Sequence, residues 1–227
     1  MKNHCPQFRA GFIAVVLGSL LAFAATARAA DEVRYKSKVL GNKVRIDGAA
    51  NVHDWTMEGT LIGGWLELPA SVVLDSSQAA AAGVGADGKI PARAEVRIPV
   101  TSVKNIHGYE GMDEVMQAAM DAKDYPAILF HLTDMTLKQP HAAGAPLEFD
   151  TQGTLSLNGS TNKISFPVTI ESVDKTTLKV KAAGIPINMT DYGVKPPVKA
   201  VLFVTKPEVK ISFEWVIGLA SKPAETK

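Results

Sequence analysis

Apolar and polar side chains alternate with a period of two through most of this chain, and that alternation limits the chain to a β fold. In residues 147–158, Leu147, Phe149, Leu155 and Leu157 share one face, while the even-numbered residues between them are all polar. Successive side chains of a strand point to opposite faces of a sheet, so each alternating run predicts a half-buried strand. The other predicted strands are 33–39, 44–50, 56–68, 95–100, 128–132, 164–170, 178–189 and 209–217.

The number of these strands favours closure of the sheet. Eight or nine strands in an open sheet would leave long unpaired edges, which closure into a barrel removes. About eight strands enclose an interior just wide enough for side chains or one small ligand. We therefore predict an all-β fold in the form of a barrel.

Turn signals divide the predicted strands. Asn158-Gly159 lies between two alternating runs and predicts a tight hairpin. The apolar phase shifts by one residue at Ala183-Gly184, which indicates a β-bulge. The alanine- and glycine-rich segment Ser76–Pro91 is predicted to be a surface loop.

One amphipathic helix is predicted from Met112 to Lys123, because proline in the pair Tyr125-Pro126 cannot continue a helix. Its apolar residues recur at helical spacing and form one stripe of Met112, Val115, Met116, Ala119 and Met120. Thioethers adapt to irregular or exchangeable apolar partners. The helix is interpreted as a lid or plug on the barrel; the alternative is a helix that simply fills a core.

The alternation alone does not say which face of the barrel is apolar. An outer-membrane barrel would turn its apolar face outward and line a polar lumen. Charged residues of both signs on the polar faces, the interrupting helix and a polar C-terminal tail favour an apolar interior instead.

Residues 1–29 are predicted to be a cleaved signal peptide, with Lys2 and Arg9 before an apolar run and an A-x-A site at Ala27-Arg28-Ala29. The domain is predicted to span 30–220, followed by a disordered tail at 221–227. The protein is therefore expected to be exported to the periplasm. Cys5 is the only cysteine, so the mature chain would contain neither a disulfide nor a thiolate metal site.

The charge balance argues against a nucleic-acid partner, which would require a basic face. The full chain has 24 Lys and Arg against 23 Asp and Glu, and removal of the signal peptide leaves 21 against 23.

The polar candidates for chemistry are few. His53-Asp54-Trp55 is interpreted as a turn, and the alternative makes His53 a proton carrier or metal ligand. His107 and His131 flank the predicted helix and would need to converge with His53 to bind zinc, although no pair has ligand spacing. Neither a catalytic residue nor a metal site nor a cofactor is predicted.

The chain resembles the YceI-like family, described as lipocalin-like, polyisoprenoid-binding periplasmic proteins. Five ordered segments that cover most of residues 33–217 carry the resemblance: 44–55 (VRIDGAANVHDW), 95–103 (EVRIPVTSV), 112–130 (MDEVMQAAMDAKDYPAILF), 149–170 (FDTQGTLSLNGSTNKISFPVTI) and 187–197 (INMTDYGVKPP). The resemblance implies an antiparallel eight-stranded lipocalin-like barrel with the helix against one opening. It also implies an apolar interior that holds a polyisoprenoid, a prenyl quinone or a fatty acyl chain for storage or transport.

The inward apolar residues are the predicted ligand contacts. They are Val96, Ile98, Val100, Met112, Met116, Met120, Phe130, Leu132, Phe149, Leu155, Phe166 and Val168. The expected partner is a long-chain isoprenoid or other lipid, and transient membrane contact and a homodimer are left open. Two other hypotheses stand beside this one: a periplasmic enzyme or metal-binding protein that uses His53, His107 or His131, and an interaction domain with a solid core.

Overall fold

The structure is a computed structural model that describes residues 31–78, 82–109, 111–138, 142–199 and 203–220. The predicted signal peptide and the predicted C-terminal tail lie outside the described residues. Within these ranges the regular secondary structure is almost entirely β-strand, with the short helical segments α1 (Met112–Ala119), η1 (Val100–Ser102) and η2 (Met189–Tyr192). The strands are β1 (Glu32–Ser37), β2 (Lys43–Ala50), β3 (Asp54–Gly59), β4 (Gly63–Pro69), β5 (Lys89–Ile90), β6 (Arg93–Pro99), β7 (Lys104–Asn105), β8 (Ala127–Leu137), β9 (Leu147–Leu157), β10 (Ser160–Asp174), β11 (Thr177–Asn188), β12 (Val198–Lys199) and β13 (Phe203–Leu219).

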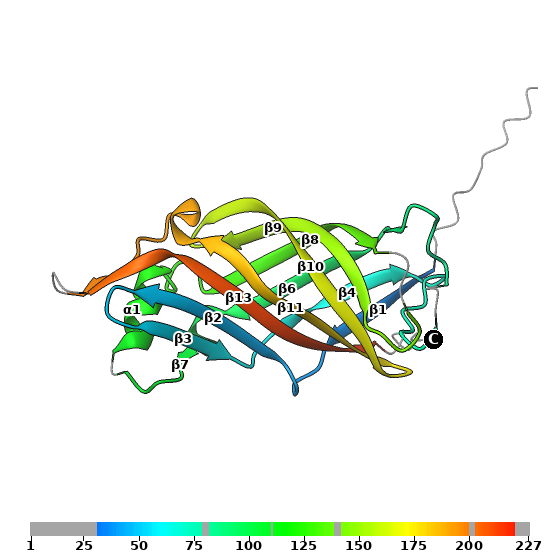
Figure 1. Cartoon of the computed structure of the whole chain (residues 1–227), viewed down its shortest axis with the longest axis horizontal. Helices are drawn as coiled ribbons and strands as arrows, with labels where there is room; N and C mark the ends of the chain where they lie inside the picture. The colour runs from blue at the N-terminus through cyan, green and yellow to red at the C-terminus, as the bar shows by residue number, and fades with distance from the viewer. Residues whose placement is uncertain (1–30, 79–81, 110, 139–141, 200–202, 221–227) are drawn as a thin grey trace, which may run out of the picture.

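Eight antiparallel strands close into a barrel in the order β1-β4-β6-β8-β9-β10-β11-β13. The ring closes where the C-terminal end of β13 pairs with β1, through the pairs Tyr35↔Leu219 and Ser37↔Ile217. The longer N-terminal part of β13 pairs with β2 instead, and β2 continues through β3 to β7. These three strands extend the wall beside α1 (Figure 1). The predicted antiparallel eight-stranded barrel is confirmed.

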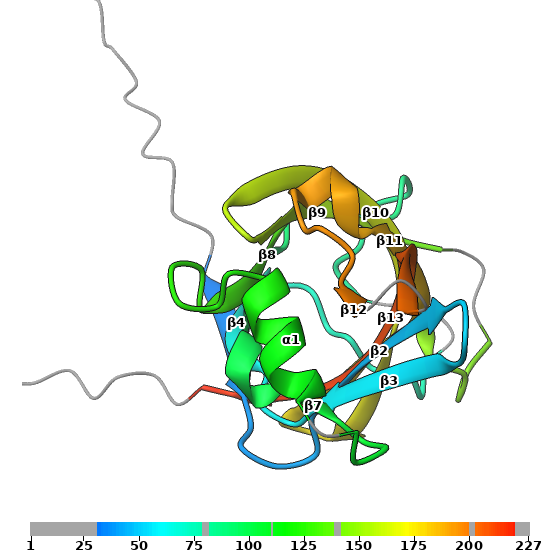
Figure 2. The same cartoon turned by 90° about the vertical axis from the view of Figure 1, so that its left-hand side faces the viewer.

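Helix α1 lies across one opening of the barrel (Figure 2). Its predicted start at Met112 is correct, but the helix ends at Ala119 and does not reach Lys123. Asp121 adopts a left-handed conformation with φ of 47°, which a continuing helix cannot contain. Within the described residues, no helix combines the length and apolarity that a membrane span requires.

The local turn signals hold in the structure. Asn158 and Gly159 have φ of 49° and 75°, the positive values of a two-residue hairpin loop. The register of β11 against β13 shifts between Ala182 and Ile185, which confirms the bulge. The predicted strand 56–68 is wrong in extent, because it divides into β3 and β4. The predicted loop Ser76–Pro91 contains the short strand β5 at its end, and residues 79–81 lie outside the described residues.

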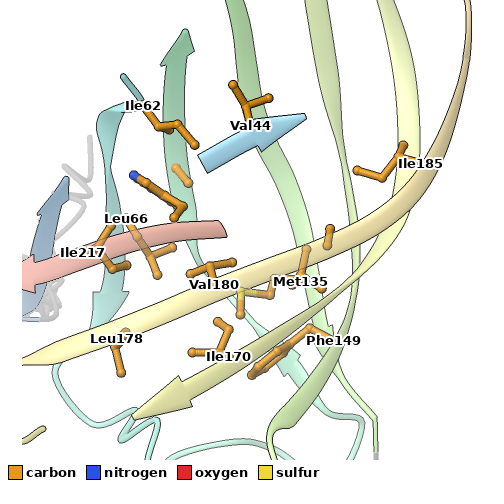
Figure 3. Packing of buried hydrophobic residues seen from close by; sticks show 14 of the residues in the cluster. Val44, Ile62, Leu66, Met135, Phe149, Ile170, Leu178, Val180, Ile185 and Ile217 are labelled. Atoms are coloured by element: carbon orange, nitrogen blue, oxygen red, sulfur yellow. The ribbon is translucent and has the colours of Figure 1, made fainter. Parts of the chain in front are cut away.

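The apolar faces of the strands point into the barrel, as expected. Figure 3 shows buried side chains such as Phe149, Ile170 and Leu178 gathered between the strands. Toward the end opposite α1, called here the closed end, Leu147, Phe149 and Ile217 have no exposed surface. That end of the barrel is filled by its own side chains.

A candidate ligand-binding cavity

The half of the barrel nearer α1 is hollow. A cavity of about 680 Å³ extends along the inner faces of β8, β9, β10, β11 and β13. On β9 it is lined by Thr151, Leu155 and Leu157, whereas Leu147 and Phe149 lie outside the lining. At about 3.4 Å per residue, the stretch from Thr151 to Leu157 covers roughly 20 Å of strand. The cavity is therefore a deep pocket whose floor is the solid closed end.

The helix forms the roof of the cavity with its apolar stripe. All five stripe residues, Met112, Val115, Met116, Ala119 and Met120, line the cavity. No residue of α1 is fully buried. Asp113 attaches the helix to the barrel, because its carboxylate accepts a 2.7 Å hydrogen bond from the backbone N–H of Asn105 and pairs with Lys104 at 3.3 Å. The interpretation of the helix as a cover over an apolar interior fits this arrangement.

Three aromatic rings project from the wall of the cavity. Phe166 lies between Phe130, at a ring-centroid distance of 5.3 Å, and Phe213, at 6.2 Å and nearly perpendicular. A Cβ atom at Gly153 would collide with the Phe130 ring, so glycine on β9 lets that ring lie close to the strand. The cluster gives the cavity a broad apolar surface in its middle.

The polar atoms of the wall are largely bonded within the wall. The Thr151 hydroxyl donates to the Phe166 carbonyl at 2.6 Å, and the Trp215 indole N–H donates to the Ser37 hydroxyl at 2.6 Å. The Trp55 indole N–H is buried without a hydrogen-bond partner within the described residues. Among the described lining residues there is no Asp, Glu, Lys or Arg. An interior of this kind favours an apolar occupant.

Ten of the twelve predicted contact residues lie on the cavity wall: Val96, Ile98, Met112, Met116, Met120, Phe130, Leu132, Leu155, Phe166 and Val168. Val100 and Phe149 do not. Val100 leaves the strand pattern after Pro99 to begin η1, where it is buried. Phe149 faces inward but packs in the closed end. Contact of the ten with a ligand stays a prediction.

Sequence reasoning left out much of the opposite wall. Ile185, Ile211, Phe213 and Trp215 line the cavity from β11 and β13. They follow the same alternation as the residues that were chosen, so that pattern could have identified them. It could not indicate how far along each strand the hollow extends.

The three histidines do not converge. His53 lies at the α1 end, where its ring stacks on Tyr109 at 4.9 Å, and the His107 ring lies 5.7 Å from the same tyrosine. His131 lies half-exposed with its Nδ1 4.0 Å from the Glu95 carboxylate. In the described part of the chain, no three His, Cys, Asp or Glu side chains are grouped closely enough to hold a metal ion.

Comparisons with known proteins agree with this geometry. The model of the YceI-like domain family matches residues 49–217. The solved structure of a polyisoprenoid-binding domain from Saccharophagus degradans, described as implicated in plant cell wall breakdown, is 15% identical. It covers 82% of this chain and 98% of that chain, with a TM-score of 0.60.

The structure of BcnA from Burkholderia cenocepacia is 20% identical and covers 79% of this chain and 98% of that chain, with a TM-score of 0.55. At these identities the two structures establish the shared fold alone. The comparison with curated proteins finds no match. Because the family model matches most of the chain, this protein belongs to the YceI-like domain family.

Proposed function

We propose that this protein binds a long-chain apolar ligand, such as a polyisoprenoid, a prenyl quinone or a fatty acyl chain, and stores or transports it. The observation that carries the proposal is the cavity of about 680 Å³ with a wall almost free of polar atoms. Such a site offers shape and apolar surface, without the convergent polar groups that catalysis requires. The proposed role is therefore binding and not catalysis.

The size of the cavity sets the length of chain that it can hold. At about 30 Å³ for a group the size of a water molecule, its volume accommodates roughly 20 heavy atoms. A C16 to C20 acyl chain or four isoprene units would fill it. A longer polyisoprenoid would extend beyond the barrel.

The energetics also favour an apolar chain. Burial of each methylene contributes about 0.8 kcal/mol, so a chain of 16 carbons has a gross driving force of roughly 13 kcal/mol. Ordering of the chain and its alternative location in a membrane offset most of that gain. Affinity should therefore depend on the match between the chain and the cavity volume.

The family relationship and the sequence support the rest of the proposal. The Saccharophagus degradans domain, which shares the fold, is described as polyisoprenoid-binding. The signal-peptide pattern in residues 1–29 supports export to the periplasm, with residues 30–220 as the mature domain. N-terminal sequencing of protein recovered from the periplasm tests this part: a start at Ala30 is expected, and an intact Met1 in a cytoplasmic fraction would refute it.

The test of ligand binding is mass spectrometry of organic extracts from the purified protein. A stoichiometric prenyl or acyl chain is expected in the extract, and it should be depleted from a Met116→Asp variant purified in parallel. A clean extract, together with no uptake of a C16 chain from vesicles, would instead favour an interaction domain without a ligand.

A further inference from the structure

The barrel wall is not uniformly closed, and its opening lies between two neighbouring strands. β10 and β11 pair only from Thr169↔Lys181 to Asp174↔Thr177, at the closed end. Toward α1, β10 pairs with β9 as far as Ser160, and β11 pairs with β13 as far as Asn188. The two strands therefore separate along the hollow half of the barrel.

Side-chain hydrogen bonds close the gap between β10 and β11 at the end nearer α1. The amides of Asn158 and Asn162 donate to the carbonyls of Tyr192 and Asp191 in η2, at 3.1 and 2.8 Å. Between that contact and Thr169, the segment of β10 from Lys163 to Val168 spans about 17 Å at 3.4 Å per residue. The opening is a defined window in the wall, with pairing at one end and a hydrogen-bonded bridge at the other.

The amino-acid sequence encodes the window. The two-residue loop at Asn158-Gly159 makes Leu157↔Ser160 a hydrogen-bonded pair, and alternation along the ladder then makes Asp150↔Pro167 a non-bonded pair. The nitrogen of Pro167 therefore faces β11, where it has no hydrogen to donate. Proline is confined to strand edges for this reason. On the other side of the window, β11 contains the bulge at Ala183-Gly184 and a second proline, Pro186.

A second hollow lies on the outside of the barrel at this window. This side cleft, of about 670 Å³, is lined by Pro167 and Thr169 of β10, by Lys181 and Ala183 of β11, and by Ser212 and Glu214 of β13, among others. Val168 and Phe213 line both the side cleft and the inner cavity. The two hollows therefore adjoin at these two residues, beside the part of β10 that does not pair with β11.

The chemistry of the two hollows differs. The inner cavity is apolar, whereas the side cleft is bordered by charged side chains of both signs, including Lys43, Arg45, Lys138 and Glu148. These cations already pair with carboxylates, as Lys181 does with Glu171 at 2.9 Å and Lys138 with Asp150 at 3.0 Å. The cleft thus offers a polar, charged surface directly beside an apolar one.

We propose that the window between β10 and β11 is a second ligand subsite, through which the polar end of a long-chain lipid leaves the cavity and lies in the side cleft. The inference rests on the proposed lipid-binding function and adds the direction of the bound chain. The tail occupies the cavity beneath α1, and the polar end emerges past Val168 and Phe213 instead of past the helix.

The test places one thiol at each exit, in a Cys5→Ser background that removes the only native cysteine. Ala183→Cys lies in the side cleft, Val52→Cys lies beside His53 at the α1 end, and Val173→Cys is an exposed control at the closed end. Each variant is treated with N-hexadecylmaleimide and with N-ethylmaleimide. The rate of labelling by N-hexadecylmaleimide is divided by the rate of labelling by N-ethylmaleimide. A high ratio means that binding of the hexadecyl chain brings the maleimide to that thiol.

We expect the rate ratio for Ala183→Cys to exceed those for Val52→Cys and Val173→Cys at least tenfold. A ratio for Val52→Cys that equals or exceeds that for Ala183→Cys would place the exit under α1 and overturn the inference. Equal ratios at Ala183→Cys and Val173→Cys, in variants that still retain a hydrophobic fluorophore, would also overturn it. If no variant retains the fluorophore, the proposed lipid-binding function itself fails.

Discussion

The same substitution should have different costs at the two ends of the barrel. Phe149 and Phe166 lie on adjacent strands, and both point inward. Phe149 is fully enclosed in the closed end, whereas Phe166 is half-buried and borders the cavity. The variants Phe149→Ala and Phe166→Ala therefore test whether one half of the barrel is solid and the other hollow.

The expected magnitudes follow from what each ring contacts. Phe149→Ala should cost about 3–5 kcal/mol, because the loss of apolar burial is joined by a new cavity in a packed core. Phe166→Ala loses part of its burial and its contacts with two aromatic rings, which are worth about 0.5–1.5 kcal/mol each, but it enlarges a space that already exists. We expect a cost of about 2 kcal/mol for it.

The measurement is urea unfolding of delipidated protein, followed by tryptophan fluorescence. Delipidation is needed because a bound chain stabilises the folded state and would obscure the comparison. The difference of about 2 kcal/mol should appear directly between the free energies of unfolding of the two variants. In thermal unfolding of the same samples it should appear as a difference of roughly 4–8 °C between their melting temperatures. Equal costs at the two positions would show that the cavity is filled in solution, and the reasoning behind the proposed function would then be refuted.

Three further predictions concern the lid, one turn and one close contact. Met116→Asp should reduce retention of a hydrophobic fluorophore at least tenfold, because it puts a carboxylate on the cavity roof. The exposed control Val39→Asp should retain the fluorophore normally. Equal retention by the two variants would argue against the role of α1. The backbone N–H of Thr176 and neighbouring hydroxyls lower the pKa of Asp174 from 3.8 to about 2, so the carboxylate stabilises the fold above pH 4 and that contribution is lost as the pH falls through 2. Asp174→Asn should therefore lower the urea midpoint more at pH 7 than at pH 2, and an equal difference at the two pH values would contradict this. A Cβ at residue 48 would overlap the Trp55 ring, so Gly48→Ala should cost about 1–3 kcal/mol in the same unfolding assay, and an unchanged midpoint would contradict that packing.

Features that depend on a few neighbouring residues were predictable from the sequence. The Asn158-Gly159 pair predicted the hairpin, and the one-residue shift in the apolar alternation at Ala183-Gly184 predicted the bulge. Both occur as expected. The start of α1 was also predicted correctly, but its end was not. The pattern of apolar residues does not reveal that Asp121 adopts a left-handed conformation, which ends the helix.

Two of the predicted contact residues lie away from the cavity for a different reason. Alternation assigns a side chain to the inner face of the barrel, and it assigned Phe149 correctly in that sense. It does not report the position of that residue along the barrel axis, which depends on how strands distant in sequence are staggered. Val100 lies away from the cavity because the strand ends at Pro99 and the chain turns into η1.

The hollow and the window arise from a single arrangement of the strands. At the closed end β10 pairs with both neighbours, and large side chains such as Phe149 and Ile217 are completely buried there. Beyond Thr169, β10 no longer pairs with β11, and the Pro167 nitrogen has no hydrogen to offer there, which lets the wall spread. A wider ring lined by side chains of the same size must leave space in its interior. Pro167, which opens the side of the barrel, therefore also contributes to the volume in which a ligand would lie. Pro167 in β10 and Pro186 in β11 were the signals in the sequence from which the hollow and the window could have been inferred.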